Sequence, residues 1–142
     1  MRPVQVPAAD EATAGWWDAT RTHRLGVQRC AGCSAVQHPP RQVCIHCGRT
    51  DALSLTEAAG TGVVDSYTVV HRAPAADLEV PYVVGRVRLD EGVLLLSRLE
   101  GREDLDAWRI GDRVDVDWVD LTDGRALPVF RPIADPAPPQ GP

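Results

Sequence analysis

Two C-x-x-C pairs form the strongest chemical pattern in the sequence. They are Cys30 with Cys33 and Cys44 with Cys47, and ten residues separate the pairs. Each pair presents two sulfur atoms from one turn, and two such turns can enclose a metal at metal–sulfur distances of about 2.3 Å. Zinc held by four thiolates has no open coordination position, so we expect a structural zinc site. A rubredoxin-like iron site and a site that has lost its metal are the alternatives.

The cellular compartment decides whether the four cysteines bind a metal or form disulfides, because disulfides form in oxidising surroundings. Residues 1–13 contain no apolar core typical of a secretory signal, and no apolar run approaches the roughly 20 residues that span a bilayer. We therefore expect a cytoplasmic protein without a membrane segment. Reduced thiols in that compartment favour metal binding over disulfides.

Catalytic residues are hard to find elsewhere. The sequence has no G-x-S-x-G turn, and the four cysteines are assigned to the metal. His71, Tyr67 and Tyr82 remain as the acid–base candidates of a self-contained enzyme, which we keep as an alternative. His46, inside the second cysteine turn, is expected to point away from the metal. We expect no catalytic residue in this chain.

Charge is distributed unevenly along the 142 residues. The formal net charge is −5, and all fifteen basic residues are arginine. Five arginines and no acid lie between residues 21 and 49, whereas residues 60–142 hold nine arginines and fifteen acids. Such a balance is not typical of a dedicated nucleic-acid binder, which needs a surplus of positive charge.

The segments around the cysteines must position the metal ligands. A helix is predicted from Asp10, which can cap it, to about Arg24. Trp16 and Trp17 are neighbours and point about 100° apart on a helix, so one can cover the cysteine segment while the other meets another part of the fold. Gly32 and Gly48 are expected to permit the tight cysteine turns.

From residue 53 onward, β-branched and alternating patterns predict short strands. Asp90-Glu91-Gly92 is expected to form a tight turn between two of them. Five or six strands at this spacing are typical of a small barrel, and they lie near 53–57, 62–71, 82–89, 93–99, 112–119 and 126–131. We therefore predict a mainly β fold, divided as an N-terminal segment with a helix (1–24), a zinc ribbon (25–52), a barrel (53–132) and a disordered proline-rich tail (133–142).

The order of these segments resembles the DUF35 family. The resemblance rests on the tryptophan pair at 16–17, then R-x-H-R-L-x-x-x-R-C-x-x-C, then H-P-P-R-x-x-C-x-x-C-G, followed by GTGVVDSYTVVHRAP, VPYVVGRVRLDEGVLLLSRLEG, IGDRVDVDW and LPVFRP. It covers about residues 10–132. The family resemblance implies a rubredoxin-like zinc ribbon joined to a five-stranded OB-fold, acting as an accessory domain of acyl-CoA enzymes.

Members of this family pair with thiolase-like proteins, including lipid-transfer-protein aldolases of steroid side-chain degradation, and some are fused to MaoC-like hydratase domains. The resemblance thus implies a non-catalytic subunit that supports acyl-CoA chemistry, in steroid or fatty-acyl-CoA degradation. Arginine suits the phosphates of acyl-CoA, so Arg21, Arg24 and Arg41 are the candidate contacts. A nucleic-acid-binding zinc ribbon and OB-fold is the alternative function.

Overall fold

The structure, a computed structural model, describes residues 6–133. It contains one short helix, eight strands and a 3-10 turn: α1 Ala14–Thr20, β1 Gly26–Cys30, β2 Val36–Gln37, β3 Leu53–Glu57, β4 Thr61–Val70, β5 Tyr82–Leu89, β6 Leu94–Leu99, η1 Leu105–Ala107, β7 Arg113–Asp120 and β8 Ala126–Pro132. The predicted mainly β fold is confirmed. The proline-rich tail, from residue 134 onward, lies outside the described residues. Within them, no helix has the length and apolar character needed to cross a membrane.

The cysteine segment is built on a three-stranded antiparallel sheet in the order β2-β1-β3. The central strand β1 pairs Gln28 with Gln37 of β2 and Cys30 with Leu53 of β3. We predicted that residues 53–57 belong to the barrel half, and the structure instead pairs them with β1. A strand-forming pattern of five residues indicates extended backbone but carries no information about which sheet the strand joins.

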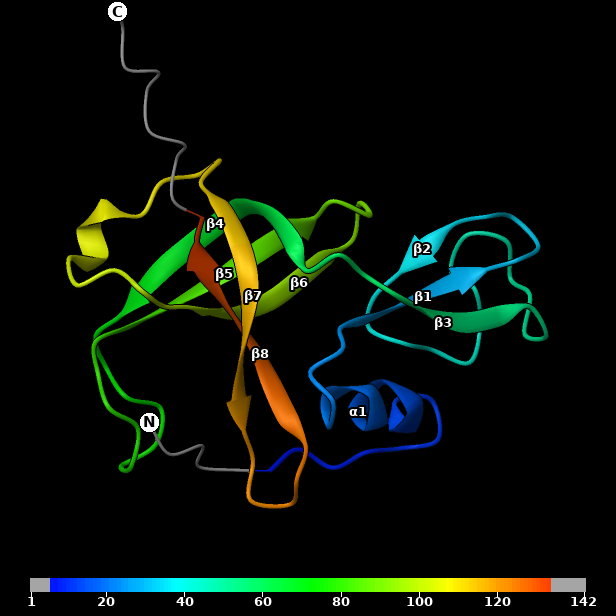
Figure 1. Cartoon of the computed structure of the whole chain (residues 1–142), viewed down its shortest axis with the longest axis horizontal. Helices are drawn as coiled ribbons and strands as arrows, with labels where there is room; N and C mark the ends of the chain where they lie inside the picture. The colour runs from blue at the N-terminus through cyan, green and yellow to red at the C-terminus, as the bar shows by residue number, and fades with distance from the viewer. Residues whose placement is uncertain (1–5, 134–142) are drawn as a thin grey trace, which may run out of the picture.

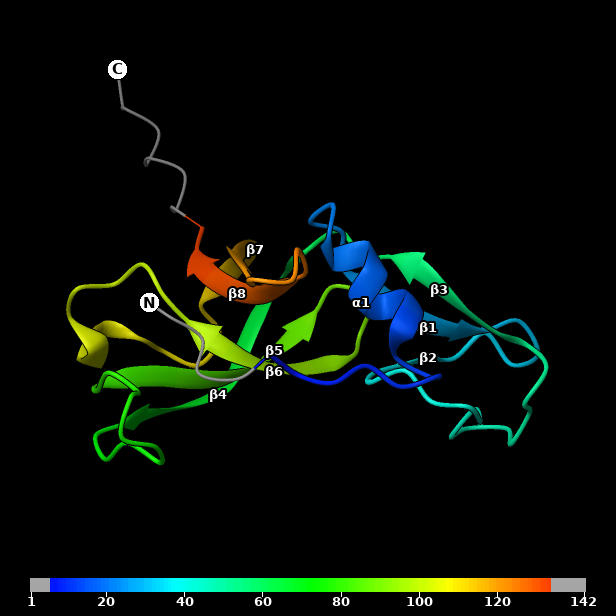
Figure 2. The same cartoon turned by 90° about the horizontal axis from the view of Figure 1, so that it is seen from below.

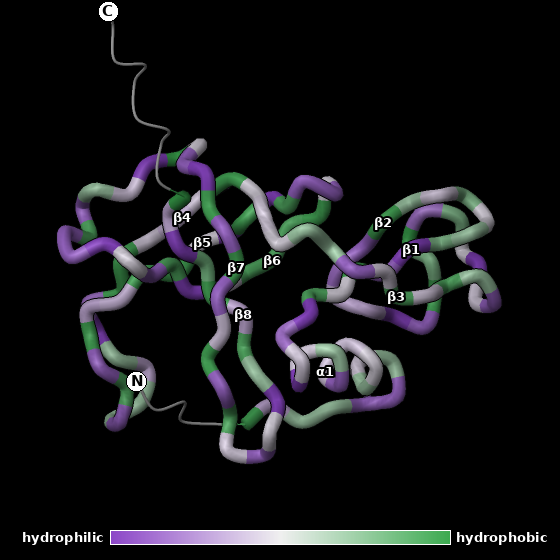
Figure 3. The backbone as a smooth tube through the Cα atoms, viewed as in Figure 1, coloured by the Kyte–Doolittle hydropathy of each residue, from purple (hydrophilic) through white to green (hydrophobic). Residues whose placement is uncertain are grey.

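The remaining five strands close into a barrel in the order β4-β5-β6-β8-β7 (Figure 1). All neighbours are antiparallel except β6 and β8, which run parallel and pair Leu99 with Phe130. Apolar and polar stretches alternate along the barrel strands (Figure 3), as expected when alternate side chains enter a core. The predicted inward face of β5 is confirmed, because Val83, Val87 and Leu89 are buried.

The helix is shorter than the sequence predicts. It begins at Ala14 and ends at Thr20, with no side-chain hydrogen bond at its first cap. Asp10 accepts a hydrogen bond of 2.9 Å from the backbone N–H of Thr13, so it closes a turn before the helix instead of capping it. The expected start at Asp10 therefore marks this separate turn.

Helix α1 lies between the cysteine segment and the barrel (Figures 1 and 2). Trp16 Nε1 donates a 3.0 Å hydrogen bond to the carbonyl of Gly26 in β1. Trp17 instead lies under the guanidinium of Arg125, the residue before β8, which is 4.6 Å from the centroid of the Trp17 ring. The expectation that the two indoles serve different parts of the fold is confirmed, and their rings meet at 90°.

Polar contacts also fasten α1 and the turn after it to the hairpin of β7 and β8. The buried hydroxyl of Thr20 accepts a hydrogen bond from the N–H of Ala126 at 3.1 Å. His23 stacks on Trp118 with ring centroids 5.4 Å apart, and its Nε2 lies 2.7 Å from a carboxylate oxygen of Asp120. Trp16, Leu25 and Val27 share one hydrophobic cluster with the barrel interior, so the two parts have a common core.

Candidate metal centre and adjoining groove

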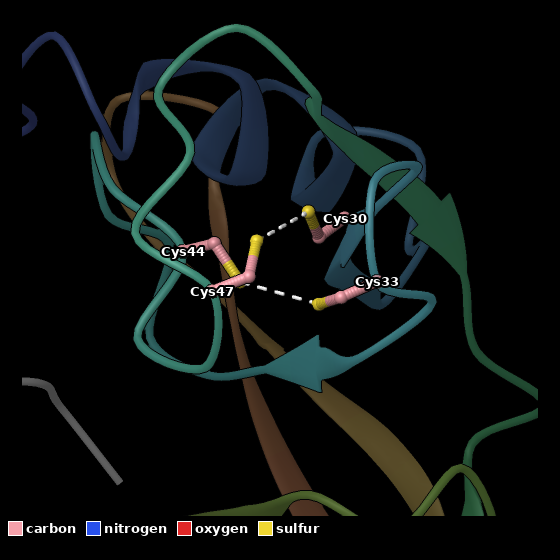
Figure 4. Close-up of side chains that lie close together, drawn as sticks. All are labelled: Cys30, Cys33, Cys44 and Cys47. Carbon is pink, nitrogen blue, oxygen red and sulfur yellow. Dashed lines mark hydrogen bonds between the residues drawn. The ribbon is translucent and has the colours of Figure 1, made fainter.

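The four cysteine sulfurs converge at one end of the three-stranded sheet (Figure 4). The sulfurs of Cys30 and Cys47 are 3.7 Å apart, as are those of Cys33 and Cys44, and all four lie within 4.8 Å of one another. Ligands at about 2.3 Å from a central ion occupy a tetrahedron with edges of about 3.8 Å. The cysteines are therefore arranged to hold a metal ion.

Equivalent backbone positions shape the two cysteine turns. The residue after each second cysteine is left-handed, with φ of +64° at Ser34 and +78° at Gly48. We expected Gly32 to provide this conformation in the first turn, and the structure assigns it to Ser34. At Gly32 an added Cβ would lie 2.6 Å from Cδ of the exposed Arg49 side chain, which would have to move aside.

The thiols cannot all ionise when no cation lies between them. The N–H of Cys47, supported by that of His46 and opposed by burial, lowers the pKa of the Cys44 thiol to about 6. At Cys33 the N–H of Ala35 favours the thiolate, but burial and the neighbouring thiols outweigh it and raise the pKa to about 11. A dication among the sulfurs removes this repulsion.

Two buried glutamines, which the sequence analysis missed, position the second cysteine turn. Gln37 donates to the side-chain oxygen of Gln28 at 2.6 Å and accepts from the N–H of Ile45 at 2.9 Å. Gln28 in turn binds both backbone groups of Arg41, donating to the carbonyl at 2.8 Å and accepting from the N–H at 2.9 Å. The loop carrying Cys44 is thus anchored to β1 and β2.

The three candidate phosphate contacts meet different parts of the fold. Arg21 donates to the carbonyl of Asp123 at 2.8 Å and lies 3.6 Å from the carboxylate of Asp18. Arg24 bonds Thr22 and borders a small hollow, and Arg41 is exposed on the loop before Cys44. The contacts of the three side chains therefore do not converge on one point.

The acid–base candidates show no catalytic arrangement in the described residues. The hydroxyl of Tyr67 donates to the carbonyl of Trp108 at 2.7 Å, a bond that fixes the barrel wall. The ring of Tyr82 lies under the guanidinium of Arg98 at 4.3 Å, and His71 is exposed after β4.

An apolar groove of about 590 Å³ opens between α1, the 38–40 turn of the ribbon and the barrel. We use this name for the hollow lined by the tryptophan pair of α1, the 38–40 turn of the ribbon, and residues of β5, β6 and β8. Its walls come from segments that are far apart in the chain, so no local sequence pattern indicates it.

Acidification is expected to destabilise the fold through His38, which lines the groove. Burial lowers the pKa of its imidazole from 6.5 to about 4. As the pH falls, the imidazole is therefore protonated in the unfolded chain before it is protonated in the folded one. The free energy of unfolding has its full value above pH 6.5 and decreases as the pH approaches 4, by at most about 3 kcal/mol. Urea unfolding between pH 5 and 7.5 should show a flatter pH profile for His38→Gln than for the parent. The exposed His71→Gln control should keep the parent slope, and parallel profiles for all three proteins would contradict the prediction.

Two family models match successive parts of the chain. Residues 17–53 match the family described as "ChsH2, rubredoxin-like zinc ribbon domain", and residues 55–119 match "ChsH2, C-terminal OB-fold domain". The expected OB-fold is thereby confirmed for the five-stranded barrel.

Individual relatives carry names from acyl-CoA metabolism. A "probable enoyl-CoA hydratase alpha subunit" of Thermomonospora curvata is 44% identical over 89% of this chain, and a "3-oxo-4,17-pregnadiene-20-carboxyl-CoA hydratase alpha subunit" of Mycobacterium tuberculosis is 31% identical over 68%. The chain spans only 39% and 30% of these two relatives. The solved structure "Ltp2-ChsH2(DUF35) aldolase" is 43% identical, with a TM-score of 0.81 over 89% of this chain and 98% of the solved one.

Proposed function

Because the chain belongs to the DUF35 family, with a ChsH2-type zinc ribbon and OB-fold, we propose that it is a non-catalytic accessory subunit of an acyl-CoA enzyme. Its partner in this proposal is a thiolase-like aldolase of the lipid-transfer-protein type, acting in the cytoplasm on a steroid or fatty-acyl-CoA. The observation that carries the proposal is the likeness to the solved aldolase component over 98% of that component's length.

Zinc is the metal we propose for the four-cysteine site, with Cys30, Cys33, Cys44 and Cys47 as its ligands. The donor set and the sulfur spacing support this choice. Bound zinc would neutralise the thiolates and hold the two turns together, and four sulfurs would leave no position for a substrate. The bond-breaking chemistry therefore belongs to the partner.

A hydratase is a second candidate partner. Two relatives are named as hydratase alpha subunits, and this chain matches less than half of each. The unmatched part of those relatives is where a MaoC-like hydratase domain would lie. The same accessory subunit could then serve successive steps of one acyl-CoA route.

Co-elution tests the proposed function. The chain should form a stable complex with a lipid-transfer-protein-type aldolase in size-exclusion chromatography, and retro-aldol cleavage of a hydroxyacyl-CoA should depend on that complex. The chain alone should produce no product from the same thioester. An aldolase that is fully active alone and never co-elutes would refute the proposal, and turnover by the isolated chain would refute its non-catalytic part.

Arginines of the ribbon side are proposed to contact the phosphates of the acyl-CoA. Arg24 and Arg41 are exposed, whereas Arg21 is already engaged with Asp18 and Asp123. Removing a charge-assisted hydrogen bond costs about 1.5–3 kcal/mol, so Arg24→Gln combined with Arg41→Gln should weaken CoA binding by the complex at least about tenfold. Arg21→Gln should have a smaller effect. Isothermal titration with CoA measures this, with the exposed Arg72→Gln as control, and equal affinities in all variants would contradict the assignment.

A further inference from the structure

The outer strand of the ribbon sheet has an open edge. Strand β3 lies at one end of the order β2-β1-β3, and four of its five residues are exposed (Figure 1). Edge strands are commonly protected by lysine, proline or a β-bulge. The β3 sequence LSLTE has no lysine or proline, and its one charged residue, Glu57, lies at the end. Its register with β1 also runs without a shift, so β3 carries none of these protections.

Alternate residues of β3 direct their backbone groups away from the sheet. Directly after β3, the N–H of Ala58 donates to the carbonyl of Leu25 at 2.8 Å. In an antiparallel ladder, residues that bond one neighbouring strand alternate with residues that face the other way. The backbone N–H and C=O groups that point outward are therefore those of Leu53, Leu55 and Glu57. Within the described residues, these outward groups make no hydrogen bond.

The small hollow that Arg24 borders lies beside this edge and has room for one side chain. Its volume is about 210 Å³, and Leu55 and Glu57 line it on the β3 side, opposite Gly15 and Ala19 of α1. A cavity of about 150 Å³ accommodates benzene, so the hollow can hold the side chain of one leucine or phenylalanine.

Arg29 provides a positive charge on the other face of the sheet. It lies on β1 directly opposite Ser54, so both side chains are on the face that Leu55 does not occupy. Arg29 is exposed and takes part in none of the ion pairs of the described residues. A strand paired with β3 would lie about 10 Å from β1, which an arginine and a carboxylate side chain can span across the small Ser54.

We propose that β3 is a docking edge for an extended segment of the partner enzyme, which adds a fourth strand to the ribbon sheet. In this segment an apolar residue enters the hollow, and an adjacent acidic residue faces Arg29. Backbone hydrogen bonds supply the affinity of such strand addition, and the alternate side chains supply its specificity. This inference rests on the proposed function, because it names the surface through which the accessory subunit would hold the aldolase.

A second copy of this chain fits the edge less well. Antiparallel pairing of two β3 strands about Leu55 would be symmetric and would place Thr56 of one copy opposite Ser54 of the other. No carboxylate would then face Arg29. The unpaired charge of Arg29 therefore favours an acidic strand from a different protein.

Amide exchange in the complex with a lipid-transfer-protein-type aldolase tests the edge directly. The outward N–H groups of β3 should exchange quickly in the free chain and at least about tenfold more slowly in the complex. Deuterium uptake by the peptide that contains residues 53–57 measures this. A complex in which this peptide exchanges as fast as in the free chain would overturn the inference but not the proposed function. An aldolase that does not bind the parent chain would overturn both.

Leu55→Pro and Leu55→Ala form a matched pair of variants. Both remove the leucine side chain, but only proline removes the outward N–H, and neither removes a group that bonds β1. We expect Leu55→Pro to bind the aldolase at least about tenfold more weakly than Leu55→Ala does. Zinc content and circular dichroism verify the fold of both variants. Equal affinities of the two folded variants would overturn the inference.

Charge reversal at Arg29 tests the acidic residue of the docked segment. Arg29→Glu should weaken aldolase binding at least about tenfold, whereas Arg72→Glu, at an exposed arginine after β4, should leave it unchanged. Equal effects of the two reversals would contradict the acidic segment. Analytical ultracentrifugation of the chain alone tests for the second copy. A parent dimer that Leu55→Pro dissociates would identify a second copy as the occupant and overturn the inference.

Discussion

Replacing Cys44 by serine is expected to release the metal and unfold the ribbon sheet. Three sulfurs cannot complete the tetrahedron, and Leu25 and Val27 are the main apolar side chains that this segment contributes to the common core. In isolated zinc-finger peptides, zinc binding supplies about 10–16 kcal/mol of folding free energy. Zinc content per chain, measured with a chromogenic chelator, should fall below one, and the near-ultraviolet circular dichroism of the tryptophans should weaken.

His46→Ser is the matched control for this experiment. His46 lies in the same turn as Cys44 but is exposed and stands outside the sulfur cluster. This variant should keep one zinc per chain and the parent spectrum, and chelation of the parent protein should reproduce the spectrum of Cys44→Ser. A full complement of zinc in Cys44→Ser, or a native spectrum after complete chelation, would contradict a structural metal.

Substituting Trp16 by alanine should lower the free energy of unfolding by about 3–5 kcal/mol. The side chain is 7% exposed, and it packs in the core cluster that the ribbon and the barrel share. Its removal leaves a cavity at this junction and deprives the Gly26 carbonyl of its donor. Urea unfolding followed by far-ultraviolet circular dichroism measures the loss.

Trp16→Phe separates packing from hydrogen bonding. Phenylalanine keeps most of the buried apolar surface but cannot donate to Gly26, so we expect a cost of about 1–3 kcal/mol. A loss as large as that of the alanine variant would assign the effect to the hydrogen bond instead of to packing. Parent-like stability in Trp16→Ala would show that the ribbon and the barrel do not depend on this side chain.

Local patterns predicted the convergence of the four cysteine sulfurs and most strands, because those features depend on neighbours in sequence. The C-x-x-C spacing placed the sulfurs, and the alternation of Val83, Val87 and Leu89 identified the inward face of β5. The Asp90-Glu91-Gly92 turn is also confirmed, with φ of +96° at Gly92. Each of these features could be derived from fewer than about twenty consecutive residues.

Features that depend on distant pairings could not be predicted in this way. The strand at 53–57 joins the ribbon because it pairs with β1, a choice made by tertiary contacts. In the sequence, Gln28 and Gln37 are not distinguished from other polar residues. They form a buried pair because the loop around Arg41 covers them in the folded chain. The groove is lined by residues as far apart in the sequence as Trp16 and Val129, so it exists only in the folded chain.

The parallel pairing of β6 with β8 has a consequence for the order of folding. Strands β4, β5 and β6 follow one another as antiparallel neighbours, so they can associate through short connections. Strands β7 and β8 also form a local antiparallel hairpin, and this hairpin must close the barrel by pairing β7 with β4 and β8 with β6. The closing contacts, such as that of Ser97 with Pro128 across 31 residues, carry a larger loss of chain entropy. Three groove residues, Leu127, Pro128 and Val129, lie on this hairpin. The groove is therefore complete only when the barrel has closed.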